Sequence, residues 1–214
     1  MRRVVITGLG TVNALGSSVA ESWPRMLRGE SGVRPIDHFD AADLPVRFSG
    51  HVIVDLEQHF TAPDFRKLDP FVMYALLAAS EALEDAGLPD IREEPEEARE
   101  RYACIIGTGI GGITGIVEQQ EVLHDRGARR VTPHFIPRIM PNAVSGQVAI
   151  AQGLMGTVFT TSSACASSGH AIGLAMLAIR SGEAVLCITG GSESATTPLA
   201  VAGFASAKAL STRN

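Results

Sequence analysis

Cys165 is the residue with the strongest claim to chemistry in this sequence. It lies in SSACASSGHAIGLAM (162–176), after a β-branched run and at the head of an apolar, alanine-rich stretch. We expect a helix over 165–181, which places the thiol in the first turn, where free N–H groups and the helix dipole stabilise an anion. That position favours a thiolate nucleophile. Free cysteines are also among the most buried residues, so position alone leaves a small core residue equally open.

No histidine has a claim to act as the base for this thiol. His170 follows Cys165 by five positions, which is about 140° around a helix axis, so the two side chains should diverge. We expect the remaining histidines in loops or on helix surfaces. Cys104 and Cys187 lie within apolar runs, and we expect both to be strand residues of the core.

Two glycine-rich motifs and the metal-ligating residues offer competing functions. GTGIGG (107–112) matches the dinucleotide fingerprint, but the second strand with its acidic residue is missing, which favours a tight strand-to-helix turn. GGSES (190–194) departs from the serine-hydrolase elbow at its last glycine, and we interpret it as a turn at a strand end. Histidines and cysteines do not occur at metal-ligand spacing, so no metal site is expected.

The elements that would position Cys165 alternate between strands and helices, which predicts an α/β fold with a parallel or mixed sheet. We expect most of 30–65 to be loop and the acidic run 91–100 to be a loop or short helix. The expected strands are 3–7, 102–106, 158–161 and 184–189, and the expected helices are 18–28, 67–86, 113–125, 142–152 and 165–181.

Composition limits the class of protein. The chain has 214 residues, a formal net charge of −5, 45% hydrophobic residues and three cysteines without paired spacing. This is the composition of a globular protein, and its charge does not favour nucleic-acid binding. An odd cysteine count without a paired motif fits a reducing compartment, so we expect the protein in the cytoplasm. No apolar run reaches the length of a membrane span.

Four stretches resemble the β-ketoacyl-acyl-carrier-protein synthases of the thiolase superfamily, most closely the type II fatty-acid form (synthase II). They are VVITGLGTVNALG (4–16), IIGTGIGG (105–112), SSACASSGHAIG (162–173) and GGSESATTPLAVAGFASAKALSTRN (190–214). The resemblance implies that residues 1–214 are the N-terminal thiolase-like half. Its fold would be one mixed five-stranded sheet flanked by helices, half of a layered α-β-α-β-α arrangement. The family's catalytic histidines and lysine lie in a C-terminal half, so we expect the 214 residues alone to be inactive.

The resemblance also implies a reaction. Cys165 would accept an acyl group as a thioester, and decarboxylation of malonyl-acyl carrier protein would supply the carbon nucleophile for a Claisen condensation. No cofactor or metal is implied. The alternatives are a type II polyketide ketosynthase subunit, a non-catalytic chain-length-factor-like partner, a thiolase or CoA-dependent relative, and a Rossmann oxidoreductase. Chain-length factors usually replace the cysteine, which this chain keeps.

Further residue roles follow from the resemblance alone. It implies an acyl pocket formed by Gly109, Ile110, Gly111 and Phe204, with Ile110 as a gate for chain length. It implies a homodimer whose interface includes the strand at 158–161. The acidic acyl carrier protein would dock on basic residues, for which the candidates are Arg66, Lys67, Arg129, Arg130 and Lys208.

Overall fold

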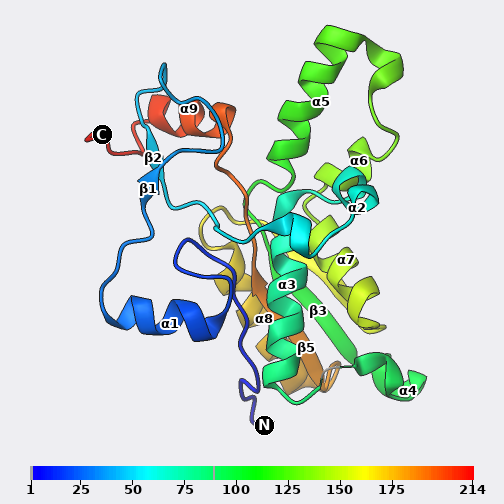
Figure 1. Ribbon diagram of the computed structural model, residues 1–214. Helices are drawn as coiled ribbons and strands as arrows, with labels where there is room; N and C mark the ends of the chain where they lie inside the picture. Colours follow the sequence, from blue (N-terminus) through cyan, green and yellow to red (C-terminus); the bar gives the residue numbers. More distant parts are fainter. Residues whose placement is uncertain (1, 89) are drawn as a thin grey trace.

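The computed structural model describes residues 2–88 and 90–214 and has three layers, with a parallel sheet between two layers of helices (Figure 1). The helices are α1 Val19–Leu27, α2 Ala62–Lys67, α3 Pro70–Asp85, α4 Glu96–Arg99, α5 Ile113–Arg126, α6 Phe135–Ile139, α7 Ala143–Gln152, α8 Ser167–Ser181 and α9 Pro198–Ser206. Short 3₁₀ turns span Leu56–Gln58 (η1), Ile91–Glu93 (η2) and Ala128–Arg130 (η3). The strands are β1 Arg34–Pro35, β2 Phe48–Ser49, β3 Tyr102–Gly107, β4 Val158–Thr161 and β5 Leu186–Gly191.

The central sheet has the order β4-β3-β5, with all three strands parallel. Along β3, Cys104 and Ile106 face a core formed with α3 and α7, whereas Ile105 faces α8 through Ala171 and Ala175. Both faces of β3 are therefore covered, which explains why its sequence is continuously apolar. The α/β class is as the sequence predicts.

The sheet is smaller than expected. The resemblance predicts a mixed sheet of five strands, whereas the described residues form three parallel strands and a separate antiparallel pair, β1 with β2. The predicted strand at 3–7 is not part of either sheet. Its β-branched residues favour extended backbone, but a strand also needs a partner, and Ile6 is 81% exposed.

The segment after residue 7 is held against α3 instead. Cβ atoms built on Gly8 and Gly10 would lie 2.0 and 1.9 Å from carbonyl oxygens of α3, so only glycine permits this approach. The Leu9 N–H donates to Asp85 at 2.8 Å, and the Thr11 N–H donates to Glu81 at 2.8 Å. Carboxylates of the helix therefore satisfy backbone groups that a neighbouring strand would otherwise pair.

The predicted helices are confirmed, with shifts at their ends. Ser18 caps α1, and α3 ends just before Gly87, whose φ is +72°. The helix expected at 67–86 begins later, at Pro70, and a separate short helix, α2, precedes it at 62–67, where mostly loop was expected. Within the described residues, no helix combines the length and hydropathy needed to cross a bilayer.

Candidate active site

Cys165 lies in a tight turn between β4 and α8. The structure starts α8 at Ser167, so the thiol precedes the helix by two residues rather than lying in its first turn. Ala164 has φ +49°, a left-handed conformation that costs a residue with a Cβ about 1–2 kcal/mol. Cys165 is exposed. The strained turn exposes the thiol at the positive end of a helix. A thiolate is stabilised there, so the position suits a nucleophile.

Ser167 holds this turn together. Its hydroxyl accepts a hydrogen bond from the Ser163 N–H at 2.8 Å and donates one to the Ala164 carbonyl at 2.7 Å. Its own carbonyl accepts from the Thr161 hydroxyl at 2.7 Å, which ties the turn to the end of β4. The residue is buried, so these bonds are shielded from water. Sequence reasoning missed Ser167 because serine is common in such stretches and its partners are set by the turn.

Two glycines at strand ends allow α8 to approach the sheet. A Cβ on Gly107, the last residue of β3, would lie 2.3 Å from the Ser167 carbonyl carbon. A Cβ on Gly191, the last residue of β5, would lie 2.5 Å from the Ser168 Cβ. Real Cβ atoms do not come this close, so both positions must be glycine for the helix start to sit where it does. These glycines therefore determine how close the start of α8, and with it the turn that carries Cys165, lies to the sheet.

The GTGIGG loop lies beside the same turn. The Ser162 hydroxyl donates to the Gly109 carbonyl at 3.3 Å, and a Cβ on Gly109 would be 3.5 Å from the Ala164 Cα. The Gly109 and Ile110 N–H groups both donate to one carboxylate oxygen of Glu193, at 2.9 Å each. The Glu193 carboxylate thus lies where a bound anion would otherwise accept hydrogen bonds from the N–H groups of this loop. That arrangement supports the turn interpretation over a dinucleotide fingerprint.

The GGSES segment has a structural role, because its side chains hold neighbouring backbone in place. The sequence did not reveal that Glu193 is the residue that holds the 109–110 loop. Ser192 donates its hydroxyl to the Phe71 carbonyl at 2.6 Å and is not paired with a base. Glu193 lies more than 80 residues from the loop that it binds, so only the folded chain shows the contact. Gly111, with φ +85°, completes the turn.

The neighbouring histidine and the other cysteines have different environments from Cys165. The His170 Nδ1 is 2.9 Å from the Ser163 hydroxyl, so its hydrogen bond goes to that serine. Burial raises the pKa of Cys104 to about 12 and the pKa of Cys187 to about 11. These two thiols are therefore protonated and inert at neutral pH, as expected of core residues.

The predicted pocket residues do not all lie together. Ile110 is partly exposed, and its neighbour Gly109 lies against Ala164 in the Cys165 turn. Phe204 lies on α9 and lines a separate pocket of about 250 Å³ with Val33 and Phe48. Within the described part of the chain, neither Cys165 nor Ile110 lines that pocket. The role of Phe204 beside an acyl chain stays a prediction.

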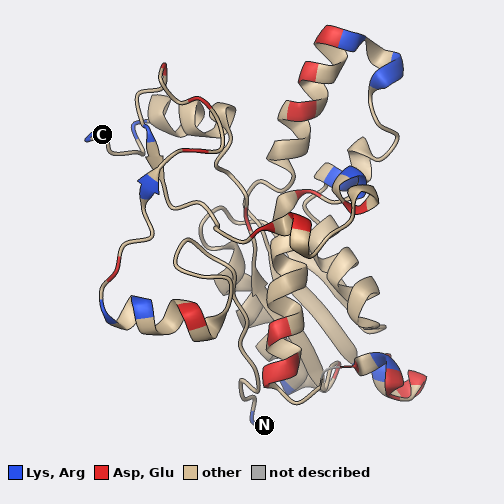
Figure 2. Cartoon of the chain, in the orientation of Figure 1, with Lys and Arg blue, Asp and Glu red and all other residues tan. Residues whose placement is uncertain are grey.

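The predicted docking residues are all exposed and fall into two groups. Arg66 and Lys67 end α2, and Arg129 and Arg130 lie in η3 beyond α5; α6 contacts both α2 and α5. Figure 2 shows basic residues coloured along the ribbon at α2 and at the far end of α5, on the same side of the molecule. Lys208 follows α9, across the molecule from α5 (Figure 1).

Two polar clusters are absent from the sequence-based predictions. Asp69 is fully buried beside Arg138, which also pairs with Glu118 at 2.7 Å. Burial raises the pKa of Asp69 to about 6. The second cluster joins Asp37 and His38 with His51, which the sequence separates by 13 residues. Ligand spacing could not reveal this cluster because loops after β1 and β2 bring it together.

Comparisons with known proteins identify the family of the chain. Residues 1–214 match the family model described as "Beta-ketoacyl synthase, N-terminal domain". The 3-oxoacyl-[acyl-carrier-protein] synthase 2 of Vibrio cholerae is 42% identical over 214 residues, covering 100% of this chain and 51% of that relative. A crystal structure of a beta-ketoacyl synthase from Burkholderia phymatum is similar with a TM-score of 0.83 and 32% identity, covering 100% of this chain and 52% of that one.

A third similar structure is the ishigamide ketosynthase/chain length factor, with a TM-score of 0.85 and 26% identity over 98% of this chain and 52% of that one. The chain therefore spans about half the length of the relatives it matches. The match of the whole chain to the family model, and an identity above 40% to a curated relative, show that the chain belongs to the β-ketoacyl synthase family and corresponds to its N-terminal domain.

Proposed function

We propose that the full-length protein is a 3-oxoacyl-[acyl-carrier-protein] synthase with Cys165 as its acyl acceptor. The observation that carries the proposal is the placement of an exposed thiol on a strained turn, at the N-terminal end of a 15-residue helix, in a member of this family. The name of the Vibrio cholerae relative supports the same substrate class. Such an enzyme lengthens an acyl chain during fatty acid synthesis.

The chemistry assigned to this chain is the transfer of the acyl group. The Cys165 thiolate attacks the carbonyl carbon of an acyl thioester, a new carbon–sulfur bond forms, the carbon–sulfur bond of the donor breaks, and the carrier protein leaves as its thiolate. The positive end of α8 stabilises the thiolate before attack and the developing negative charge during it. Malonyl decarboxylation then produces carbon dioxide and a carbanion equivalent. This carbanion attacks the enzyme thioester, giving a 3-oxoacyl product and restoring the thiolate.

The acyl chain would extend from Cys165 toward the loop at residues 109–111. Ile110 is the candidate gate for chain length, since it lies next to the turn and its side chain is partly exposed. Glu193 would keep the loop in place by holding the Gly109 and Ile110 N–H groups. Phe204 would join this pocket only if α9 moves or further chain completes the site.

We also assign the protein a homodimeric state and a cytoplasmic location. β4 is an edge strand that pairs with β3 on one side, and its Val158 and Phe159 side chains are partly exposed. A partner strand at this edge would pair the free backbone groups. All three cysteines are free, which suits a reducing compartment. Light scattering of the full-length protein tests the first assignment, and a stable monomer at micromolar concentration would contradict it.

The alternative is a polyketide ketosynthase subunit or a chain-length-factor-like partner. The retained Cys165 argues against a chain-length-factor-like partner, and the higher identity to the curated synthase than to the ishigamide ketosynthase/chain length factor favours the fatty-acid reaction. The two products differ, because one extension round gives a single 3-oxoacyl chain whereas repeated extension gives a poly-oxo chain.

The decisive experiment incubates full-length protein with acyl- and malonyl-carrier protein and identifies products by mass spectrometry. Wild type should form a 3-oxoacyl carrier protein two carbons longer than the acyl donor, and a Cys165-linked acyl adduct should accumulate when malonyl donor is omitted. Cys165→Ala should lose both the product and the adduct, while Cys187→Ala should keep both. An adduct on another residue would refute the assignment.

A further inference from the structure

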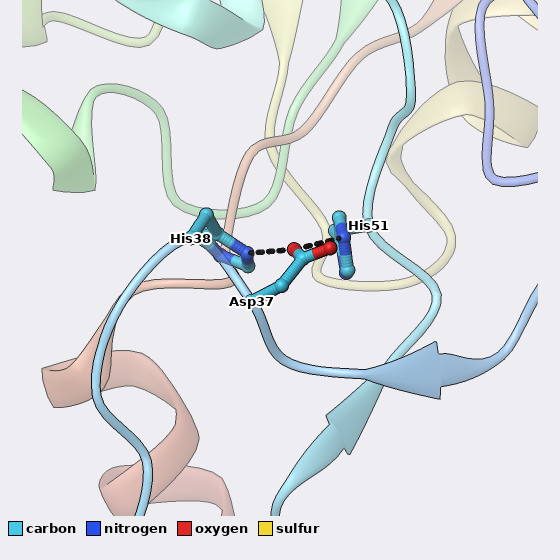
Figure 3. Close-up of side chains that lie close together, drawn as sticks. All are labelled: Asp37, His38 and His51. Atoms are coloured by element: carbon cyan, nitrogen blue, oxygen red, sulfur yellow. Dashed lines mark ion pairs between the residues drawn. The ribbon is translucent and has the colours of Figure 1, made fainter.

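Asp37, His38 and His51 converge beside a pocket of about 500 Å³, away from Cys165. Figure 3 shows the three side chains pointing toward one another from two segments of chain, one after β1 and one after β2. One ligand atom from each residue lies within 4.8 Å of the others. Two imidazoles and one carboxylate make up a donor set that suits zinc and related transition metals.

Hydrogen bonds on the far side of each ring determine which nitrogen faces the cluster. The His38 Nε2 is 2.9 Å from the Thr196 carbonyl, which can only accept, so Nε2 carries the proton and Nδ1 keeps its lone pair. The Arg34 Nε–H points at the His51 Nε2 at 3.0 Å and donates to it in the tautomer that carries its proton on Nδ1, where the Ser49 hydroxyl lies 2.9 Å away. Outer partners of this kind fix metal-binding histidines.

These tautomers turn three lone-pair donors toward one point. The Asp37 Oδ1 lies 3.0 Å from the His51 Nε2 and 3.7 Å from the His38 Nδ1. Ligand atoms at about 2.0–2.1 Å from a tetrahedral zinc ion are separated by about 3.3–3.4 Å, which lies between these two distances.

We propose that Asp37, His38 and His51 form a binding site for a zinc-class divalent transition-metal ion. Three protein ligands leave a fourth position to water, and the 72% exposure of the Asp37 side chain gives the ion a route from solvent. Through His38 the ion would tie the segment after β1 to Thr196, three residues beyond Glu193. The site would therefore brace the segment whose carboxylate holds the 109–110 loop.

Arg34 opposes binding and gives the proposal a distinctive test. Its Nε–H occupies the His51 lone pair and must give way to the ion. The guanidinium keeps backbone acceptors at His51 and at Ala14, so it can yield this one bond without losing its place. Removing its positive charge should strengthen metal binding, which a purely structural cluster would not predict.

The test titrates the full-length, metal-stripped protein with Zn²⁺ against a chromogenic chelator, and repeats the titration with Co²⁺. Wild type should bind a single Zn²⁺ and give the visible absorption of tetrahedral Co²⁺. Asp37→Asn and His51→Gln should each weaken binding about tenfold or more, since even outer partners of metal ligands cause losses of that size. Arg34→Gln should bind more tightly than wild type.

The controls are His59→Gln and His124→Gln, which change exposed histidines outside the cluster and should leave binding unchanged. Circular dichroism checks that each variant is folded. If His51→Gln unfolds, Asp37→Asn still tests whether the cluster binds zinc, because the exposed Asp37 side chain can be changed without disturbing the core. The proposal is overturned if folded wild type binds no Zn²⁺, or if Asp37→Asn binds it as tightly as wild type.

Discussion

At the scale of single residues, the three cysteines should differ sharply in reactivity. Cys165 is exposed next to a helix N-terminus, whereas burial raises the pKa of Cys104 to about 12 and of Cys187 to about 11. Because only a thiolate alkylates quickly, limiting iodoacetamide should modify Cys165 first in the folded full-length protein. Peptide mapping over time measures this order. Equal labelling of all three cysteines would remove the case for Cys165 as nucleophile.

Asp69 should make stability depend on pH in an unusual direction. Burial raises its pKa from 3.8 to about 6, so the folded state holds the proton more tightly than the unfolded state. The free energy of unfolding should therefore fall as pH rises from about 4 through 6. Asp69→Asn keeps an oxygen for the Gly115 N–H and removes the ionisation cost, so it should gain about 1–3 kcal/mol over wild type at pH 7.

Chemical denaturation at pH 5 and pH 7 measures this gain. At pH 5 the difference between Asp69→Asn and wild type should be smaller, because most folded wild type is then protonated. A variant that is less stable than wild type by the same amount at both pH values would mean that the Arg138 interaction outweighs the burial cost.

Sequence reasoning singled out Cys165 as the candidate nucleophile but not the residues that hold it. Cys165 is visible because its residue type and its place before an apolar run carry the signal. Ser167 and Glu193 act through contacts whose geometry exists only after folding, and serine and glutamate are common in any turn. The cluster of Asp37, His38 and His51 was missed for the same reason.

At the scale of elements, the contact between β3 and α8 should tolerate no added atom. Gly107→Ala would place a Cβ 2.3 Å from the Ser167 backbone, so the start of α8 must shift. We expect a loss of about 1–3 kcal/mol in stability, together with slower alkylation of Cys165, because the turn moves with the helix. Thermal denaturation and iodoacetamide kinetics measure the two effects.

Gly173→Ala is the matched control for this substitution. Gly173 lies within α8, and a Cβ there would meet nothing within 4 Å. Alanine in a helix interior is favoured over glycine by about 0.5–1 kcal/mol, so this variant should be as stable as wild type or more stable. If both variants behave alike, the close approach at Gly107 does not position the nucleophile.

Some elements are determined by residues within their own segment, whereas others depend on a partner elsewhere in the chain. Helices such as α1, α5 and α7 were predicted because caps, periodicity and glycine stops lie within each segment. The strand expected at 3–7 was wrong because strand formation depends on a partner, and this segment packs on α3 instead. The helix expected at 67–86 starts three residues later than predicted, although Pro70 gave a signal for this start.

At the scale of the whole molecule, one face is unusually apolar. Leu174 and Leu177 on α8 are exposed and line one hollow together with Phe159 of the neighbouring edge strand β4, which is exposed as well. Monomeric soluble proteins seldom expose contiguous apolar area of this kind, so we expect it to be covered in the full-length protein. The 214 residues alone should aggregate at concentrations where the full-length protein stays clear, and sedimentation of both at equal concentration checks this.

Docking of a carrier protein should depend on the exposed basic pair in η3. The chain is net negative, so an acidic partner needs a local basic surface. Arg129 and Arg130 are in η3, and the basic segments at the far end of α5 and at α2 lie on one side of the molecule (Figure 2). Exposed charges act mainly on encounter rate. Reversal of both arginines to glutamate should lower kcat/KM for acyl-carrier-protein substrates by about tenfold at low salt and by less at high salt.

The matched control reverses Arg2 and Arg3, another adjacent exposed pair. This pair lies next to the N-terminus, which Figure 1 shows at the opposite end of the molecule from the far end of α5. It changes net charge by the same amount, so an effect of overall charge would appear in both variants. A small acyl thioester that needs no docking separates a binding defect from a catalytic one. Equal losses with the small substrate would mean that the η3 arginines support the fold rather than the carrier protein.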